Sequence, residues 1–222
     1  MKNFSKNSIK NLIFDLGNVL IYIDTNATKE AFKNLGFREI EKPTEAIQQT
    51  LLAFERGEIS PENFRKTLRG YARTGLTDAQ IDTAWNALLK NYAIENLKLI
   101  AQLRENYRTF LLSNTNYIHW QHFRPRLEAL RQRHQLPELF EREYYSHNLR
   151  SRKPEEAIYK QVLADAQIVP EETLFADDRP ENLQAAQKLG IRPLHIHSPD
   201  ELPGAIEALH PELKQNAFSP DK

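Results

Sequence analysis

The stretch Asn11-Leu-Ile-Phe-Asp-Leu-Gly-Asn18 determines how the rest of the chain can fold. Its first half, residues 11–14, is short and mostly apolar, which is typical of a buried strand. The run stops at Asp15, and Gly17 and Asn18 then supply the residue types of a turn. We therefore expect a buried strand that ends on an aspartate.

Four further apolar segments have the same character and predict strands at residues 109–112, 143–145, 173–176 and 192–196. Helical patterns separate most of them. One apolar stripe precedes the second strand, at Ile94, Leu97, Ile100 and Ala101. Pro154 and Pro180 each open a helix, and Gly190 closes the latter. This alternation predicts an α/β fold, a Rossmann-like parallel sheet with helices on both faces.

One insertion interrupts the alternation between Asp24 and about Tyr92, where four helical stripes follow one another without a strand. Ser60 with Pro61, and Thr77 with Asp78, have the residue types of helix starts. The stripes are Ala31/Phe32/Leu35, Ile47/Leu51/Phe54, Phe64/Leu68/Tyr71 and Ile81/Trp85/Leu88/Leu89. We expect a core domain of residues 1–23 and 93–222 and an inserted α-helical bundle at 24–92.

Composition narrows the function classes. The 222 residues suit one domain with an insertion, and 40% hydrophobic and 27% charged residues are ordinary for a globular protein. Thirty basic residues balance thirty acidic ones, which argues against nucleic acid as a partner. Without cysteine, the nucleophile cannot be a thiol. Asp15 and Asp24 interrupt the amino-terminal apolar run, so we expect a cytoplasmic protein without a membrane partner.

Polar residues follow four of the predicted strands at their carboxyl ends, where an open parallel sheet binds its ligands. Any one of them alone could be a helix cap, a turn former or a solvated loop residue. The adjacent acidic pair after the fourth strand is best explained by a cation shared with the aspartate after the first. The residues are Asp15, Ser113, Asn114, Lys153, Asp177 and Asp178.

This set of side chains favours phosphoryl transfer. Mg²⁺ prefers carboxylate, water and phosphate oxygens. Asp15 could serve as both metal ligand and nucleophile if a metal and Lys153 neutralise the phosphate. Ser113 and neighbouring backbone amides at a helix start could then hold phosphate oxygens.

The motifs resemble a known family. Residues 14–19, 112–114 and 152–154, and residues 175–178 with Asn182, resemble in order the four motifs of the haloacid dehalogenase (HAD) superfamily. The resemblance covers essentially the whole chain, and the helical insertion occupies the position of that family's C1 cap. Within the superfamily, the chain is most similar to sugar phosphatases of the α-D-glucose-1-phosphate phosphatase type. These share the Asp-Leu-Gly-Asn-Val opening, the Ser-Asn-Thr-Asn run and a loop like residues 56–60.

The resemblance implies a magnesium-dependent phosphatase that acts on a small phosphorylated metabolite, with a sugar phosphate favoured, through an aspartyl-phosphate intermediate. Asp15 would be the nucleophile, and Lys153 would neutralise the nucleophile and the phosphate. The metal would be held by Asp15, the Gly17 carbonyl, Asp178 and Asp177. Ser113 and Asn114 would bind phosphate. Arg56 and Glu58 in the cap, and Arg152, would contact substrate; a solvated loop and a surface ion pair are their alternatives.

One departure leaves other functions open. Most HAD phosphatases have a second aspartate, the general acid, where this chain has Gly17. General acid catalysis is typically worth about 10²–10⁴-fold, so the enzyme is slow, uses leaving groups that need little protonation, or recruits another acid. A haloacid dehalogenase, whose halide leaves without a proton, is one alternative. A non-catalytic phospholigand-binding protein is another.

An unusually long segment, residues 117–141, separates the serine and lysine motifs. It predicts an extra helix or helix pair, at the border of the site or at an oligomer contact. The oligomeric state is left open. His119 and His122 lie three residues apart, but no third ligand stands at a suitable spacing, so packing or surface histidines are expected there.

Overall fold

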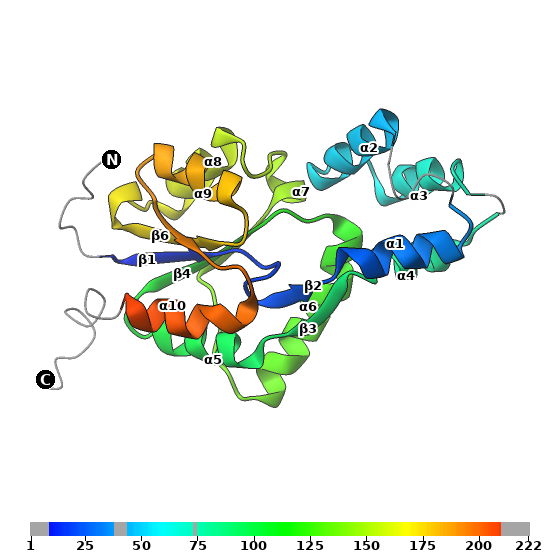
Figure 1. Ribbon diagram of the computed structural model, residues 1–222. Helices are drawn as coiled ribbons and strands as arrows, with labels where there is room; N and C mark the ends of the chain where they lie inside the picture. Colours follow the sequence, from blue (N-terminus) through cyan, green and yellow to red (C-terminus); the bar gives the residue numbers. More distant parts are fainter. Residues whose placement is uncertain (1–8, 38–43, 73–74, 210–222) are drawn as a thin grey trace, which may run out of the picture.

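A five-stranded parallel sheet forms the centre of the molecule, in the strand order β5-β4-β1-β6-β7. The computed structural model describes residues 9–37, 44–72 and 75–209, so both ends of the predicted core domain lie partly outside it. The five predicted strands are confirmed, with small shifts at their ends. They are β1 (Asn11–Phe14), β4 (Arg108–Ser113), β5 (Arg142–Tyr145), β6 (Thr173–Asp177) and β7 (Arg192–His195) (Figure 1).

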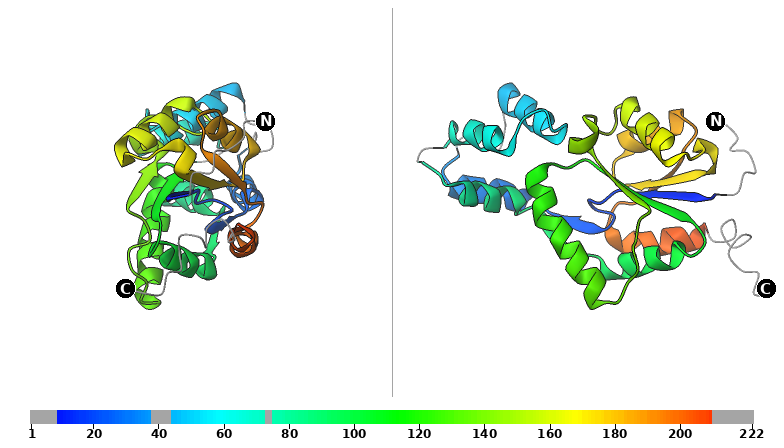
Figure 2. Two further views of the ribbon diagram at one scale, coloured as in Figure 1. Left: turned by 90° about the vertical axis from the view of Figure 1, so that its left-hand side faces the viewer. Right: turned by 180° about the vertical axis from the view of Figure 1, so that it is seen from behind.

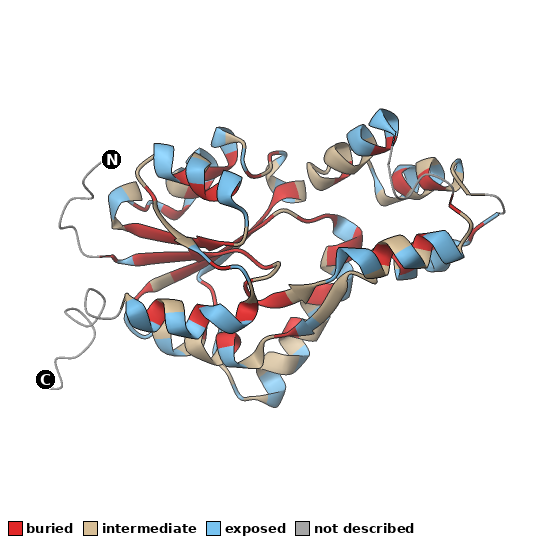
Figure 3. Ribbon diagram, in the orientation of Figure 1, coloured by how far each residue is buried: buried red, intermediate tan, exposed pale blue. Residues whose placement is uncertain are grey.

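Helices cover both faces of this sheet, as the alternating pattern predicts (Figures 1 and 2). On β1, Leu12 and Phe14 belong to one buried cluster and Ile13 to another, because successive strand residues point to opposite faces. One layer contains α5 (Ile94–Leu103), α6 (Tyr117–Arg133) and α10 (Leu202–Ala208); the other contains α8 (Glu156–Ala166) and α9 (Pro180–Lys188). The three inner strands, β1, β4 and β6, are buried along most of their length, whereas the edge strands β5 and β7 are more exposed (Figure 3).

The inserted segment forms the four predicted helices, α1 (Thr25–Asn34), α2 (Glu45–Glu55), α3 (Pro61–Arg69) and α4 (Asp78–Asn86). Ser60 and Thr77 are N-caps, as their residue types indicate. The bundle has a hydrophobic cluster of its own, in which the rings of Phe54 and Phe64 stack with centroids 4.0 Å apart. It lies beyond the carboxyl ends of the sheet strands, with α4 beside α6 and α2 beside α7 (Ser146–Leu149). We call this bundle the cap.

The predicted helix over Leu88 and Leu89 is wrong at its end. Helix α4 stops at Asn86, and Leu89 begins β3 (Leu89–Tyr92), which pairs in antiparallel fashion with β2 (Ile21–Ile23). A three-residue and a four-residue strand are too short for a periodicity of two to show in sequence, and each is ordered by a partner far away in the chain. This ribbon connects the cap to the core (Figure 1). The domain boundaries at 23/24 and 92/93 remain a prediction.

Several smaller features complete the description of the core. Helix α8 begins at Glu156, so Pro154 lies ahead of it instead of opening it; the Lys153–Pro154 bond is cis. The extra segment after the serine motif is one long helix, α6, with Pro125 inside it. Short 3₁₀ helices occur at Pro170–Glu172 and Pro199–Glu201. None of the helices within residues 9–37, 44–72 and 75–209 has the length and apolar character needed to span a membrane.

Candidate active site

Three carboxylates converge at the carboxyl edge of the sheet. Asp15 follows the central strand β1, Asp177 ends the neighbouring strand β6, and Asp178 comes next. Each offers an oxygen that lies within 4.8 Å of the others. These are the acidic residues that the sequence places together, and hard oxygen donors at this spacing suit a divalent cation such as Mg²⁺.

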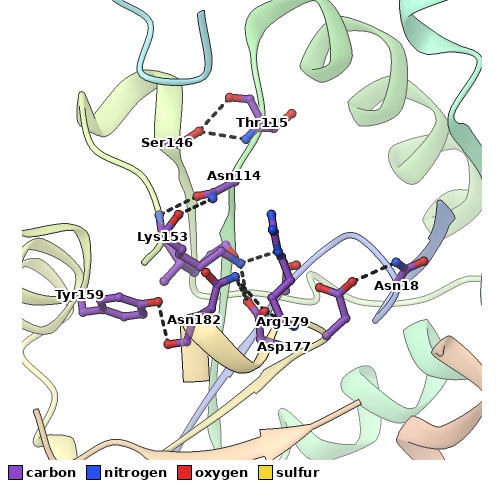
Figure 4. A network of polar contacts seen from close by, with 12 residues as sticks. Asn18, Asn114, Thr115, Ser146, Lys153, Tyr159, Asp177, Arg179 and Asn182 are labelled. Carbon is purple, nitrogen blue, oxygen red and sulfur yellow. Dashed lines mark hydrogen bonds and ion pairs between the residues drawn. The ribbon is translucent and has the colours of Figure 1, made fainter. Parts of the chain in front are cut away.

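Lys153 lies between two of these carboxylates, with its side chain only 1% exposed. Its Nζ is 2.7 Å from Asp15 Oδ1 and 2.7 Å from Asp177 Oδ2, and it donates to the Leu112 carbonyl at 2.9 Å (Figure 4). Burial opposes the charge, but the attraction of Asp15 and Asp177 outweighs it and raises the pKa of the lysine. The ammonium therefore stays charged at the bottom of the site.

The surroundings of Asp15, by contrast, favour its neutral form. Its burial raises its pKa from 3.8 to about 7, which Lys153 opposes and the charges of Asp177 and Asp178 reinforce. A carboxylate in this position gains from a nearby cation, since a cation favours the ionised form. A cation bound among the three carboxylates would therefore favour the ionised form of Asp15.

Asp177 and Asp178 have different partners. Asp177 is fully buried and accepts hydrogen bonds from Lys153, from Asn182 Nδ2 at 2.9 and 3.1 Å, and from the backbone amide of Arg179 at 2.8 Å. Asp178 is half-buried and accepts from Asn18 Nδ2 at 2.9 Å. The carboxylate oxygens of Asp177 are therefore largely occupied by Lys153, Asn182 and Arg179, whereas those of Asp178 can still accept from a ligand.

Ser113 and Asn114, both predicted to hold phosphate, are placed differently. The Asn114 side chain accepts from the Lys153 amide and donates to the Lys153 carbonyl, both at 2.8 Å (Figure 4). Its side chain thus clamps the loop that carries Lys153, residues 150–155, which we call the Lys153 loop. Ser113 is 3% exposed, and its hydroxyl has no hydrogen-bond partner among the residues that the structure describes. That hydroxyl is free to bind a ligand.

Asn18 is a site residue that the sequence indicated only as part of a turn. Its φ of 52° is a left-handed conformation, which Asn tolerates better than most residues. In this conformation its amide donates to Asp178, and its Oδ1 accepts from the Ile23 amide at 3.1 Å. The Asn-after-Gly pattern could have signalled the positive φ, but nothing in the sequence identified Asp178 as the partner.

Gly17 has little room for a side chain. A Cβ added there would lie 3.2 Å from Ile23 Cγ1, so β2 would have to yield slightly for any larger residue.

The arginines predicted to contact substrate both pair with carboxylates. Arg56 in the cap donates through Nε to Glu155 at 2.9 Å, and Arg152 in the core donates through Nε to Glu55 at 2.7 Å. For Arg152, this contact matches the ion pair that was the alternative to substrate binding. Glu58, the other cap residue considered for substrate binding, is exposed.

The fold and the site define a capped, Rossmann-like enzyme with aspartates and a buried lysine at the end of its central strands. The chain belongs to the haloacid dehalogenase-like hydrolase family, whose model matches residues 9–190. The sequence resemblance to the HAD superfamily is thereby confirmed.

Its relatives include named phosphatases. A D-ribitol-5-phosphate phosphatase of Bacteroides thetaiotaomicron is 30% identical over 187 residues, 82% of this chain and 89% of that one. A HAD family enzyme from the same organism, solved with magnesium and inorganic phosphate, superposes with a TM-score of 0.75 at 38% identity, covering 84% and 93% of the two chains. A HAD-like hydrolase of Porphyromonas gingivalis gives a TM-score of 0.78 at 33% identity, covering 91% and 98%.

Proposed function

We propose that this protein is a magnesium-dependent phosphatase of a small phosphorylated metabolite, a sugar or sugar-alcohol phosphate in preference to others. The observation that carries the proposal is the buried ion pair of Asp15 with Lys153 beside Asp178. It combines a nucleophile, a fixed cation and a site for a second cation in one place. The family, the phosphatase relative and the magnesium- and phosphate-bound structural neighbour support it.

The residues of the site would have separate roles in this reaction. Asp15 and Asp178, with the Gly17 carbonyl, would hold Mg²⁺, and Asp177 would hold Lys153 in place. When bound, Mg²⁺ would neutralise phosphate charge. An oxygen of Asp15 attacks phosphorus, the bond from phosphorus to the ester oxygen breaks, and the leaving oxygen takes a proton from water. A second water then attacks the aspartyl phosphate, which releases inorganic phosphate and restores Asp15.

Three groups of this chain would hold the phosphate. The Ser113 hydroxyl, which has no partner in the part of the chain that the structure describes, would be the side-chain donor, and the backbone amide of the next residue, Asn114, would be a second donor. Lys153 supplies the positive charge, because its ammonium contacts Asp15 directly. Since Gly17 has no acid to offer, kcat should be higher for activated leaving groups than for simple alcohols among substrates that the cap binds equally well.

The test is a substrate panel of sugar phosphates, sugar-alcohol phosphates and nucleoside monophosphates, assayed for phosphate release with Mg²⁺. We expect the highest kcat/KM on a sugar or sugar-alcohol phosphate and none without Mg²⁺. A nucleotide as the best substrate would contradict the substrate class. Chloride release from a 2-haloacid without Mg²⁺ would favour a dehalogenase, and phosphate binding without turnover would favour a ligand-binding protein.

A further inference from the structure

Among the described residues, two contacts between the cap and the core differ in their chemistry. At the first, between α4 and α6, the ring of Trp85 stacks on His119 with centroids 4.9 Å apart and an interplanar angle of 10°. Trp85 Nε1 donates to Asn116 Oδ1 at 3.3 Å, and His119 Nδ1 lies 2.8 Å from Asn86 Oδ1. Ile118 of the core belongs to the cap's own hydrophobic cluster. This contact is buried and largely apolar, so separating it would expose aromatic surface.

The second contact is ionic. Two neighbouring cap residues at the end of α2, Glu55 and Arg56, face two core residues of the Lys153 loop, Arg152 and Glu155. Glu55 pairs with Arg152 and Arg56 pairs with Glu155, at side-chain exposures of 17% to 34%. The opposite assignment would bring Glu55 to Glu155 and Arg56 to Arg152, both repulsive. Charge complementarity thus allows one docking register and disfavours its alternative.

Backbone contacts reinforce that register. Gly57, with φ of +64°, approaches the core so closely that an added Cβ would lie 2.2 Å from the carbonyl oxygen of His147. The Gly57 carbonyl accepts a hydrogen bond from the Arg150 guanidinium. The turn after α2 therefore rests directly on the short helix α7 and the residue after it.

The ionic contact is continuous with the catalytic lysine's loop. Arg152 precedes Lys153, and Glu155 follows it by two residues. Glu155 uses one oxygen for Arg56 of the cap and the other for its own loop, accepting from Ser151 Oγ at 3.1 Å and from the Arg152 amide at 3.2 Å. A shift of the cap would therefore act on both residues that flank Lys153.

We propose that Glu55, Arg56, Arg152 and Glu155 form a latch that holds the cap against the core and fixes the Lys153 loop when the cap is closed. The aromatic contact of α4 with α6 is the pivot. Partly exposed ion pairs are individually weak, so this contact can release and reform while the pivot stays intact. The four residues are positioning residues, and their effect on catalysis rests on the phosphatase function proposed above.

Charge reversal tests the latch without removing side-chain bulk. Glu55→Arg and Arg152→Glu each place like charges together, and the double variant Glu55→Arg/Arg152→Glu restores attraction, with two arginines on the cap facing two glutamates on the core. Glu55 and Arg152 are the cleaner pair to exchange, because Glu155 also holds its own loop. Arg142→Glu breaks an exposed ion pair with Asp165 elsewhere in the core and is the matched control.

We expect each single reversal to lower kcat roughly tenfold, with KM changed less than about threefold, and the double variant to recover kcat to within about threefold of wild type. Arg142→Glu should leave both constants unchanged. If Arg152 binds substrate directly, the double variant stays as impaired as Arg152→Glu, with a raised KM, and the latch is refuted.

Cap position can be measured without any substrate. Because the chain has no cysteine, Lys66→Cys on α3 and Lys160→Cys on α8, both exposed, allow specific attachment of a dye pair. Single-molecule energy transfer should show a larger open population in Glu55→Arg than in wild type, and a wild-type population in the double variant. Unchanged populations in Glu55→Arg overturn the latch. This readout separates failure of the latch from failure of the phosphatase proposal, which would show as an inactive wild type.

Discussion

The ammonium of Lys153 lies 2.7 Å from Oδ1 of Asp15, and the two side chains are 1% and 11% exposed. With Asp177 and Asp178 beside them, the group contains three carboxylates and one ammonium, a net charge of −2 when all are ionised. Uncompensated buried charge is costly, and a divalent cation would neutralise this one. In the metal-free protein, burial raises the pKa of Asp15, and the charges of Asp177 and Asp178 raise it further.

Magnesium affinity should depend on pH. Because Asp15 has a pKa of about 7 without metal, it must lose a proton before it can bind Mg²⁺ well. Below pH 7 the Kd for Mg²⁺ should rise about tenfold for each unit that the pH falls, and above pH 7 it should level off. Titration calorimetry between pH 5.5 and 8.5 measures this. A Kd that does not change over this range would contradict the linkage.

Removing the Asp15 charge should stabilise the metal-free protein. The pKa of about 7 in the folded protein exceeds the ordinary value of 3.8. Ionisation therefore leaves the free energy of unfolding unchanged below pH 3.8, lowers it progressively up to pH 7, and lowers it by a constant amount above pH 7. Asp15→Asn should therefore raise the Tm at pH 8 by roughly 10 °C and by less at pH 5, at about 2–4 °C for each kcal/mol. Scanning calorimetry in the presence of a chelator measures this difference. A lower Tm for Asp15→Asn than for wild type at pH 8 would show that ionisation of Asp15 does not destabilise the fold.

Removing the Lys153 charge should have the opposite effect. Lys153→Met keeps most of the side-chain volume but leaves two buried carboxylates without their cation, which costs about 3–5 kcal/mol in comparable buried pairs. The matched control is Lys160→Met on the exposed surface of α8, which should stay within about 0.5 kcal/mol of wild type. Urea unfolding measures both. Equal effects at the two positions would show that the buried pairing contributes nothing.

The Asn18 side chain should matter for metal binding. Asn18→Gly keeps the left-handed backbone but removes the amide that orients Asp178, and Asn18→Ala removes it and adds backbone strain. Losing a residue that orients a metal ligand typically weakens metal affinity about 10- to 100-fold. We expect that loss of affinity in both variants, and a lower Tm for Asn18→Ala than for Asn18→Gly. An Mg²⁺ affinity equal to that of wild type in Asn18→Gly would show that the Asn18 side chain has no role in metal binding.

The strands and the converging residues could be predicted from sequence because their signals are local. Each buried strand is a short apolar run, and the residue that ends it lies at the binding edge of a parallel sheet, which is why Asp15 and Asp177 were found together. The ribbon of β2 and β3 could not be predicted, because neither segment is long enough to show its own period.

The division of roles within the site was also beyond the sequence. A motif identifies residue types that gather, but hydrogen bonds decide what each one does. Asn114 was expected on phosphate, whereas its side chain clamps the backbone of Lys153. Arg56 and Arg152 were expected on substrate, and their carboxylate partners come from the opposite domain, at positions that no local pattern connects.

Release of inorganic phosphate from p-nitrophenyl phosphate, compared between wild type and Asp15→Asn with and without Mg²⁺, tests the proposed nucleophile directly. We expect turnover by wild type that requires Mg²⁺ and ceases with chelator, and a loss of roughly a thousandfold or more in Asp15→Asn, as for removal of other catalytic nucleophiles. Equal activity of the two proteins, or equal inactivity, would contradict a phosphatase whose nucleophile is Asp15.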